Sequence, residues 1–263
     1  MSGEAEAARP EDVTARFTGL AGLYARARPD YPAEAIDFIL ERCGLDATCR
    51  LVDVGCGTGI SSRIFAGRGL RVVGIEPNDD MRAEAEAVPF EEGTTRPEYR
   101  VGRAEATGVA AGWADAVVAA QAFHWFDADA ALREFRRILK PHGWAILMWN
   151  ERSDVDAFSA GYGRILAATP DGVAIQHKRM TAGRILLEHP FFRDGRRDVF
   201  CHEQVLDEQG LIGRALSASY APRRPDAVAE FIASLRSLFA SHHCDGQVTL
   251  RYETAVYTAH VVD

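Results

Sequence analysis

Short apolar runs alternate with amphipathic segments along the first 150 residues, a pattern typical of a parallel sheet flanked by helices. Residues 51–54 and 115–120 are apolar almost throughout, so both predict buried strands. The remaining strands are expected at 71–75, 99–102, 144–150, 195–206 and 248–262. Helices are expected at 33–43, 60–66, 127–139, 207–217 and 226–242, and a further helix begins after Asn78, a good N-cap candidate.

The pattern changes between residues 151 and 192, where two helical stretches at 155–168 and 181–188 follow one another without a strand. We therefore expect a helical insertion after the fifth strand. At the other end, residues 1–10 are expected to form a disordered tail. Residues 11–31 have helix-compatible apolar spacing and end at prolines, which stop one helix and suit the start of the next. Residues 11–263 are expected to form a single domain.

Composition narrows the class of protein. The chain of 263 residues has a net charge of −8, from 30 basic and 38 acidic residues, which argues against a nucleic-acid surface as its main feature. It has neither a signal-peptide pattern nor an apolar run long enough to span a membrane. The five cysteines form no C-x-x-C pair, so we expect no metal site and no disulfide framework. These features predict a cytoplasmic enzyme with free thiols, a small-molecule partner, and a monomeric or homodimeric state.

A glycine-rich turn follows the first strand in the stretch from Asp53 to Gly59, which reads D-V-G-C-G-T-G. A strand that turns into a helix presents backbone N–H groups and a positive dipole end, and glycine lets a ligand approach that backbone. Glu76 ends the second strand, where a carboxylate accepts hydrogen bonds from a ribose diol. Ile60 replaces the small residue that the dinucleotide fingerprint needs, so NAD(P) is the minor alternative here. The turn predicts a nucleoside-binding unit.

This turn resembles motif I of class I S-adenosylmethionine-dependent methyltransferases, and Glu76 matches the acid that this family carries at the end of strand two. Two further stretches, Y-x-x-x-R-P-x-Y-P before the first strand and A-x-x-x-H-W-F-D after the fourth, are similar to the trans-aconitate methyltransferase-like branch. The resemblance covers residues 15–150. It implies a doubly wound, Rossmann-like α/β fold with seven strands in the order 3-2-1-4-5-7-6, the last strand antiparallel. It also implies a lid helix at 11–31 and a helical substrate cap at 151–192.

The resemblance implies S-adenosylmethionine as cofactor, with S-adenosylhomocysteine as product. The implied cofactor residues are Tyr24, Arg28, Asp53, Gly55, Cys56, Gly57, Thr58, Gly59, Glu76, Pro77, Asn78, Met81, Ala104, Glu105, Gln121, Ala122 and Phe123. Two alternatives stay open: Met81 can be plain core, and the Tyr- and Arg-rich segment can be a solvated helix rather than a lid.

Ligands bind beyond the carboxyl ends of strands in open α/β sheets, so aromatic and polar residues there are substrate candidates. The candidates, including those from the helical insertion, are Tyr31, His124, Trp125, Trp149, Asn150, Tyr162, His177, Arg179 and Tyr220. His124 is the candidate catalytic base, because imidazole titrates near neutral pH, and the alternative is a structural role in orienting its loop.

The sequence therefore predicts methyl transfer to a small-molecule acceptor, with a carboxylate or hydroxyl oxygen favoured over carbon or nitrogen. A carboxylate needs no general base, and no metal is expected. The arginine- and alanine-rich composition suggests a role in bacterial specialised metabolism. Two alternatives remain: S-adenosylmethionine used without methylation, as in cyclisation or carboxypropyl transfer, and an inactive cofactor-binding partner protein.

Overall fold

The computed structural model of the protein describes residues 22, 27–90, 94–169 and 172–262. Its strands are β1 (Arg50–Val54), β2 (Arg71–Ile75), β3 (Glu98–Arg100), β4 (Ala114–Ala120), β5 (Leu139–Arg152), β6 (Phe192–Leu206) and β7 (Val248–Val261). Its α-helices are α2 (Ala33–Cys43), α3 (Ile60–Gly67), α4 (Asp79–Ala87), α5 (Ala128–Ile138), α6 (Ala157–Ala167), α7 (Gly172–Glu188), α8 (Glu208–Leu216) and α9 (Pro225–His242). A short 3-10 helix, η2 (Phe123–Trp125), follows β4. The predicted tail and most of the predicted lid helix lie outside the described residues.

The seven strands form one sheet in the order β3-β2-β1-β4-β5-β7-β6. Strands β1 to β5 pair in parallel, and β7 is antiparallel to both of its neighbours. The predicted strand order and the antiparallel last strand are thus confirmed. The order reverses between β1 and β4, so the carboxyl ends of these strands form the crevice where doubly wound folds bind ligands.

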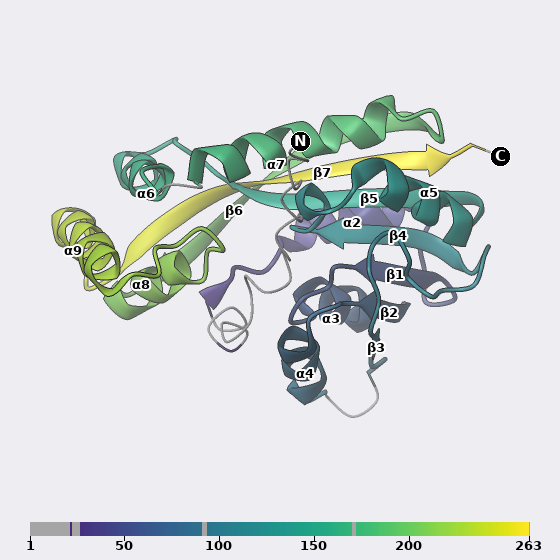
Figure 1. The fold of residues 1–263 in the computed structure, drawn as a ribbon, viewed down its shortest axis with the longest axis horizontal. Coiled ribbons are helices and arrows are strands. Elements are labelled where there is room, and N and C mark those ends of the chain that lie inside the picture. Colours follow the sequence, from purple (N-terminus) through teal and green to yellow (C-terminus); the bar gives the residue numbers. More distant parts are fainter. Residues whose placement is uncertain (1–21, 23–26, 91–93, 170–171, 263) are drawn as a thin grey trace, which may run out of the picture.

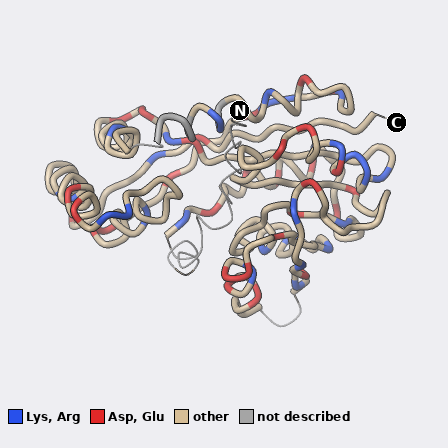
Figure 2. Tube along the Cα trace, viewed as in Figure 1, with Lys and Arg blue, Asp and Glu red and all other residues tan. Residues whose placement is uncertain are grey.

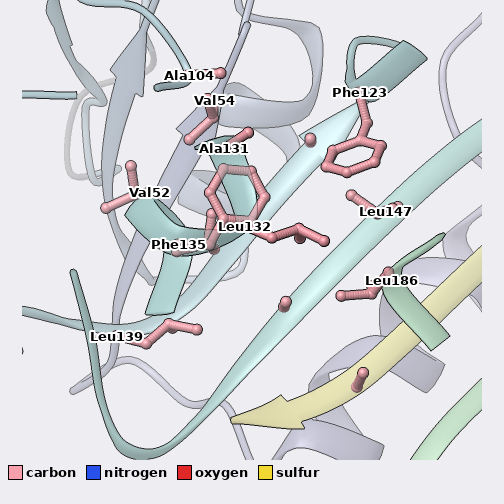
Figure 3. Close-up of a cluster of buried hydrophobic side chains, with 14 of the residues drawn as sticks. Val52, Val54, Ala104, Phe123, Ala131, Leu132, Phe135, Leu139, Leu147 and Leu186 are labelled. Carbon is pink, nitrogen blue, oxygen red and sulfur yellow. The ribbon is translucent and has the colours of Figure 1, made fainter. Parts of the chain in front are cut away.

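Helices cover both faces of this sheet (Figure 1). Because successive side chains of a strand point to opposite faces, single strands supply both hydrophobic clusters. On the face of α5 and α7, Val52, Val117 and Leu147 pack with Leu132 and Phe135 (Figure 3). The opposite face joins Leu51, Val118 and Ile146 to Ile36 and Ile39 of α2 and Phe65 of α3. The buried strands rigidly place the turns at their carboxyl ends.

A third cluster lies at the far end of the long antiparallel strand pair β6–β7, away from β1 to β3 (Figure 1). Helices α6, α8 and α9 pack there on the start of β7, through Tyr162, Leu211, Leu235 and Tyr252. Helices α6 and α7 are the two helices predicted between the fifth and sixth strands.

Two strands, β5 and β6, begin earlier than the sequence predicts, and in both cases a local backbone irregularity explains the difference. The residues between the expected helix at 127–139 and the expected strand at 144–150 lie inside β5, where pairing with β4 skips from Leu139 to Trp144 and His142 adopts a φ of 65°. Similarly, β6 begins before Gly195, because Asp194 has a φ of 53° and forms a bulge in the pairing with β7. Turn-forming residues thus interrupt these strands without ending them.

Candidate active site

The turn between β1 and α3 carries three glycines in the left-handed region, with φ of 68° at Gly55, 55° at Gly57 and 75° at Gly59. A side chain at Gly55 would come within 2.7 Å of Ala122 Cβ, so glycine keeps the turn close to the end of β4. At Gly57 an added Cβ would meet nothing within 4 Å. The backbone of Gly57 is therefore open to a ligand.

Glu76 fixes the same turn from the end of β2. Its carboxylate accepts hydrogen bonds from the backbone N–H groups of Gly57 and Asn78, each at 2.9 Å. Asn78 in turn caps α4 by accepting from Met81 N at 3.0 Å. Burial raises the pKa of Glu76, against the lowering effect of the two backbone hydrogen bonds. The carboxylate is thus held beside the open glycine with lone pairs available for further donors.

Asp53 is completely buried behind this turn. One of its oxygens, Oδ2, accepts from the hydroxyls of Ser61 and Ser62, both at 2.6 Å, whereas Oδ1 has no partner among the described residues. Burial raises the pKa of Asp53 to about 6, against those hydrogen bonds. The buried Thr58 hydroxyl also lacks a partner within the described chain. Buried polar atoms are normally hydrogen-bonded, so the Thr58 hydroxyl, which lines the cavity described next, suits a ligand with polar groups.

A cavity opens to solvent at the carboxyl ends of β1, β2 and β4. Its empty volume, including the open solvent at its mouth, is about 1090 Å³. Predicted site residues that line it are Arg28, Tyr31, Gly55, Cys56, Gly57, Thr58, Glu76, Pro77, Met81, Ala104, Glu105, Gln121, Ala122 and Trp125. Residues that sequence reasoning missed are Pro29, Ile60, Ser61, Arg103, Ala120 and Phe126. Phe126 stands in the H-W-F-D stretch and Ser61 follows the glycine turn, so proximity to these motifs was the available signal.

Four predicted cofactor residues do not line the cavity. Asp53 lies behind the turn, Gly59 packs against Tyr99, Asn78 caps α4 and Phe123 is part of the core cluster. Tyr24 lies outside the described residues.

The predicted substrate residues divide into separate environments. His124 and Trp149 contact each other, with Trp149 Nε1 donating to His124 Nδ1 at 3.3 Å. Asn150 is buried and donates to the backbone carbonyl of Asp30 at 2.9 Å, so it holds the segment that carries Arg28 and Tyr31. In contrast, His177 is exposed on α7.

Tyr162 and Tyr220 belong to the third hydrophobic cluster, at the far end of the β6–β7 strand pair. The hydroxyl of Tyr162 is buried without a partner in the described chain, whereas that of Tyr220 accepts from Arg152 Nη1 at 2.8 Å. Arg152 follows the fifth strand's Asn150 by two residues, and this position at a carboxyl end was the signal that could have revealed it. Arg179 of α7 donates through Nη2 to the side-chain oxygen of Gln121.

The charge state of His124 bears on its candidate role as a base. Burial, followed by the charges of Arg179, Arg28 and Lys178, holds the pKa of His124 well below its usual range. The imidazole is therefore neutral, and the hydrogen bond from Trp149 assigns the proton to Nε2. In this tautomer the ring presents a donor at Nε2.

Basic and acidic positions lie interspersed along the described trace (Figure 2). None of the described helices combines the length and apolar composition that a bilayer crossing requires. Within the same residues, no three His, Cys, Asp or Glu side chains are grouped so that they could hold a metal ion.

Comparison with known proteins agrees with this geometry. The model of the methyltransferase-domain family matches residues 52–147, from the first strand to the fifth. A methyltransferase of Mycobacterium tuberculosis is 32% identical over 232 residues, which are 88% of each chain. A methyltransferase-like protein of Schizosaccharomyces pombe is 32% identical over 146 residues, or 50% of each chain.

A solved structure, a putative type II methyltransferase from Anaeromyxobacter dehalogenans, shares the fold with a TM-score of 0.59 and 22% identity. The superposition covers 89% of this chain and 97% of that one. The fold, the glycine turn with its acid and the full-length relative together define the class: the chain belongs to the class I S-adenosylmethionine-dependent methyltransferases.

The residues of the cavity fit that cofactor. Gly57 offers open backbone, Glu76 has acceptor capacity for ribose hydroxyls, and the Thr58 hydroxyl is a buried polar group without a partner in the described chain.

Proposed function

We propose that this protein transfers a methyl group from S-adenosylmethionine to an oxygen atom of a small-molecule acceptor, with a carboxylate oxygen favoured. The observation that supports the cofactor site most directly is Glu76, buried and hydrogen-bonded to the open Gly57 turn at the switch point of the sheet. A solved phosphoethanolamine N-methyltransferase 2 from Haemonchus contortus, with a TM-score of 0.50, holds S-adenosylhomocysteine, in agreement with this use of the fold.

In this proposal the chain binds and orients the cofactor through the described turn. Glu76 accepts hydrogen bonds from the ribose hydroxyls, while Met81, Ala104 and Glu105 surround the adenine. The Thr58 hydroxyl, which lines the cavity, receives a polar group of the methionine end. When bound, S-adenosylmethionine supplies an electrophilic methyl group on a sulfonium.

The acceptor side of the proposal rests on Gln121, Ala122, Trp125 and Tyr31, which line the cavity beyond the turn. Aromatic faces and polar oxygens near a cation stabilise it, and enclosure of the acceptor aligns it and excludes water. These contributions come from position alone and require no proton transfer.

The state of His124 favours a carboxylate acceptor. A hydroxyl acceptor needs a base, and the neutral His124 ring uses Nδ1 to accept from Trp149 and carries its proton on Nε2. A carboxylate is already ionised at neutral pH and needs no base. We therefore propose that His124 is not the base and that its bond with Trp149 orients the loop whose Trp125 lines the cavity.

Two measurements test this proposal. Purified protein is first titrated with S-adenosylmethionine and S-adenosylhomocysteine by calorimetry, and we expect micromolar affinity for both. The loaded enzyme is then incubated with a panel of carboxylic acids and matched alcohols, and products are weighed by mass spectrometry. A gain of one methyl on acids is the expected result. Methylation of alcohols alone would contradict the carboxylate assignment, and cofactor binding without any methylated product across a broad panel would contradict turnover.

A further inference from the structure

Four arginines from distant parts of the chain gather beside the cavity. Arg28 precedes α2, Arg152 ends β5, Arg179 lies on α7 and Arg214 on α8. Burial alone would raise the pKa of Tyr220, but the charges of these four arginines outweigh burial and hold the pKa below its usual value. Tyr220 therefore reports a strong positive potential in the space that the arginines surround. We call these five residues the arginine cluster.

Each of the four arginines donates a hydrogen bond to a neutral group. Arg28 Nη2 donates to the backbone carbonyl of Ser217 at 3.0 Å, Arg152 Nη1 to Tyr220 Oη at 2.8 Å, Arg214 Nε to Tyr252 Oη at 3.0 Å, and Arg179 Nη2 to Gln121 Oε1. A phenol or an amide satisfies a donor without cancelling its charge, so these bonds leave the positive charges of Arg179 and Arg214 in place.

Arg214 and Arg179 differ in how well the protein compensates their burial. Burial would lower the pKa of Arg214, but the phenols of Tyr252, Tyr162 and Tyr220 outweigh it, so that the pKa is raised. For Arg179 burial dominates and lowers the pKa to about 10, although Tyr220 acts in the opposite direction. Moreover, Arg179 Nε is buried with no hydrogen-bond partner among the described residues. Arg179 is thus a buried guanidinium with no carboxylate hydrogen-bonded to it among the described residues.

One protein carboxylate acts on Arg179 from nearby, and it is engaged elsewhere. Burial raises the pKa of Glu151, while Arg197 and then Arg179 lower it. Glu151 pairs with Arg197 of β6 at 3.4 Å. It therefore leaves the Nε of Arg179 without an acceptor.

The cluster is continuous with the methyl-donor cavity. Gln121, which accepts from Arg179, lines the cavity, and so does Arg28. Gln121 is a non-glycine residue with a φ of 60°, held by a hydrogen bond from its N–H to Met148 O at 2.8 Å. A left-handed backbone is strained in a non-glycine residue and persists mainly at functional sites. The strained residue turns its amide between the cavity and Arg179.

We propose that the arginine cluster is the recognition site for an anionic oxygen group, a carboxylate or a phosphate, on the acceptor substrate, with Arg179 as its central ligand. This inference rests on the proposed function only in so far as the anion belongs to the methyl acceptor. Guanidinium suits the role because its planar donors match the two oxygens of such groups.

The test follows the side-chain Nε–H resonances of arginine by NMR, with the protein saturated with S-adenosylhomocysteine. The Arg179 resonance is assigned by its loss in Arg179→Lys. Succinate and inorganic phosphate are the probes, succinamide is the uncharged control, and sodium chloride keeps the ionic strength constant. We expect a saturable shift of the Arg179 resonance with one or both anions and none with succinamide. The anion whose titration saturates at the lower concentration, succinate or phosphate, is the one that the site prefers.

Two variants complete the test. Arg179→Met should weaken the binding of the preferred anion at least tenfold, as measured by calorimetry. Arg184→Met is the matched control, because Arg184 lies on the same helix, is largely exposed and pairs with Glu188 at 2.9 Å. Melting curves confirm that both variants fold. If Arg179→Met does not fold, Arg152→Met serves in its place, with the same expected loss.

Two results would overturn the inference: no saturable shift at Arg179 with either anion, or unchanged anion affinity in the folded Arg179→Met variant. The proposed function fails separately, since it requires S-adenosylhomocysteine binding in the same samples. Anion binding at Arg179 in protein that does not bind S-adenosylhomocysteine would preserve the anion site and reject the methyl-donor site.

Discussion

Replacement of Glu76 with glutamine separates what this side chain contributes to folding from what it contributes to cofactor binding. Because burial raises the pKa of Glu76, its ionised form is disfavoured in the folded state relative to the unfolded chain. A neutral side chain of the same shape removes that penalty. On the other hand, the amide offers one acceptor where the carboxylate offers two, and it faces the N–H groups of Gly57 and Asn78.

The two effects on folding oppose each other, so we expect the free energy of unfolding of Glu76→Gln to stay within about 1 kcal/mol of wild type. Binding has no such compensation. A hydrogen bond to a charged acceptor contributes about 1.5–3 kcal/mol, and the ribose hydroxyls lose that acceptor. We expect the affinity for S-adenosylhomocysteine to fall by about 1–3 kcal/mol, or roughly 5- to 150-fold.

Calorimetry with S-adenosylhomocysteine measures the affinity, and urea unfolding measures stability at the same pH. Glu86→Gln is a suitable control, because Glu86 is exposed on the same helix, α4, that Asn78 caps. A folded Glu76→Gln protein with wild-type affinity would refute the assignment of Glu76 to the ribose.

Three further predictions follow from the same region. In the folded protein the pKa of Asp53 is raised from 3.8 to about 6, so the stability that its protonated carboxyl contributes is present below about pH 4 and is lost as the pH rises through about 6. Urea unfolding should show Asp53→Asn gaining up to about 3 kcal/mol relative to wild type between about pH 4 and 7.5. Parallel pH profiles of the two proteins would contradict this. Gly57→Ala should cost about 1–2 kcal/mol of stability, because alanine is strained in the left-handed backbone of this position. The same change should abolish measurable S-adenosylhomocysteine binding, because the added Cβ occupies the open face of the turn. Retained affinity would show that the ligand approaches elsewhere. Asn150→Ala removes the hydrogen bonds to Asp30 and Thr254 and should lower stability by about 1–3 kcal/mol, with an unchanged melting temperature as the opposing result.

Apolar periodicity was sufficient to locate the buried parallel strands, because such strands are apolar on both faces. The strand order, in contrast, came from the resemblance to the methyltransferase family. The glycine turn and Glu76 located the cavity for a similar reason: a sharp strand-to-helix turn at the switch point needs those residue types at that spacing. Boundaries at His142 and Asp194 were missed because turn residues inside a strand look like strand ends until the partner strand is known.

Long-range side-chain contacts were beyond the reach of the sequence. The bond between Trp149 and His124, which bears on the role of His124 as a base, joins residues from two separate strand ends. The arginine cluster is assembled from four elements, and spacing along the chain gives no hint that Arg28, Arg152 and Arg214 surround the same phenol. Of these arginines, sequence position singled out Arg28 and Arg179, but neither their proximity nor the lack of a carboxylate hydrogen-bonded to Arg179 among the described residues was predictable.

The central claim is that the Gly57 turn and Glu76 bind S-adenosylmethionine. The most direct test is calorimetric titration of the purified protein with S-adenosylmethionine, S-adenosylhomocysteine and NADPH in parallel. We predict micromolar binding of the first two and no heat of binding from NADPH. Binding of NADPH in the absence of binding by the other two would contradict the account of the turn and of the acceptor site next to it.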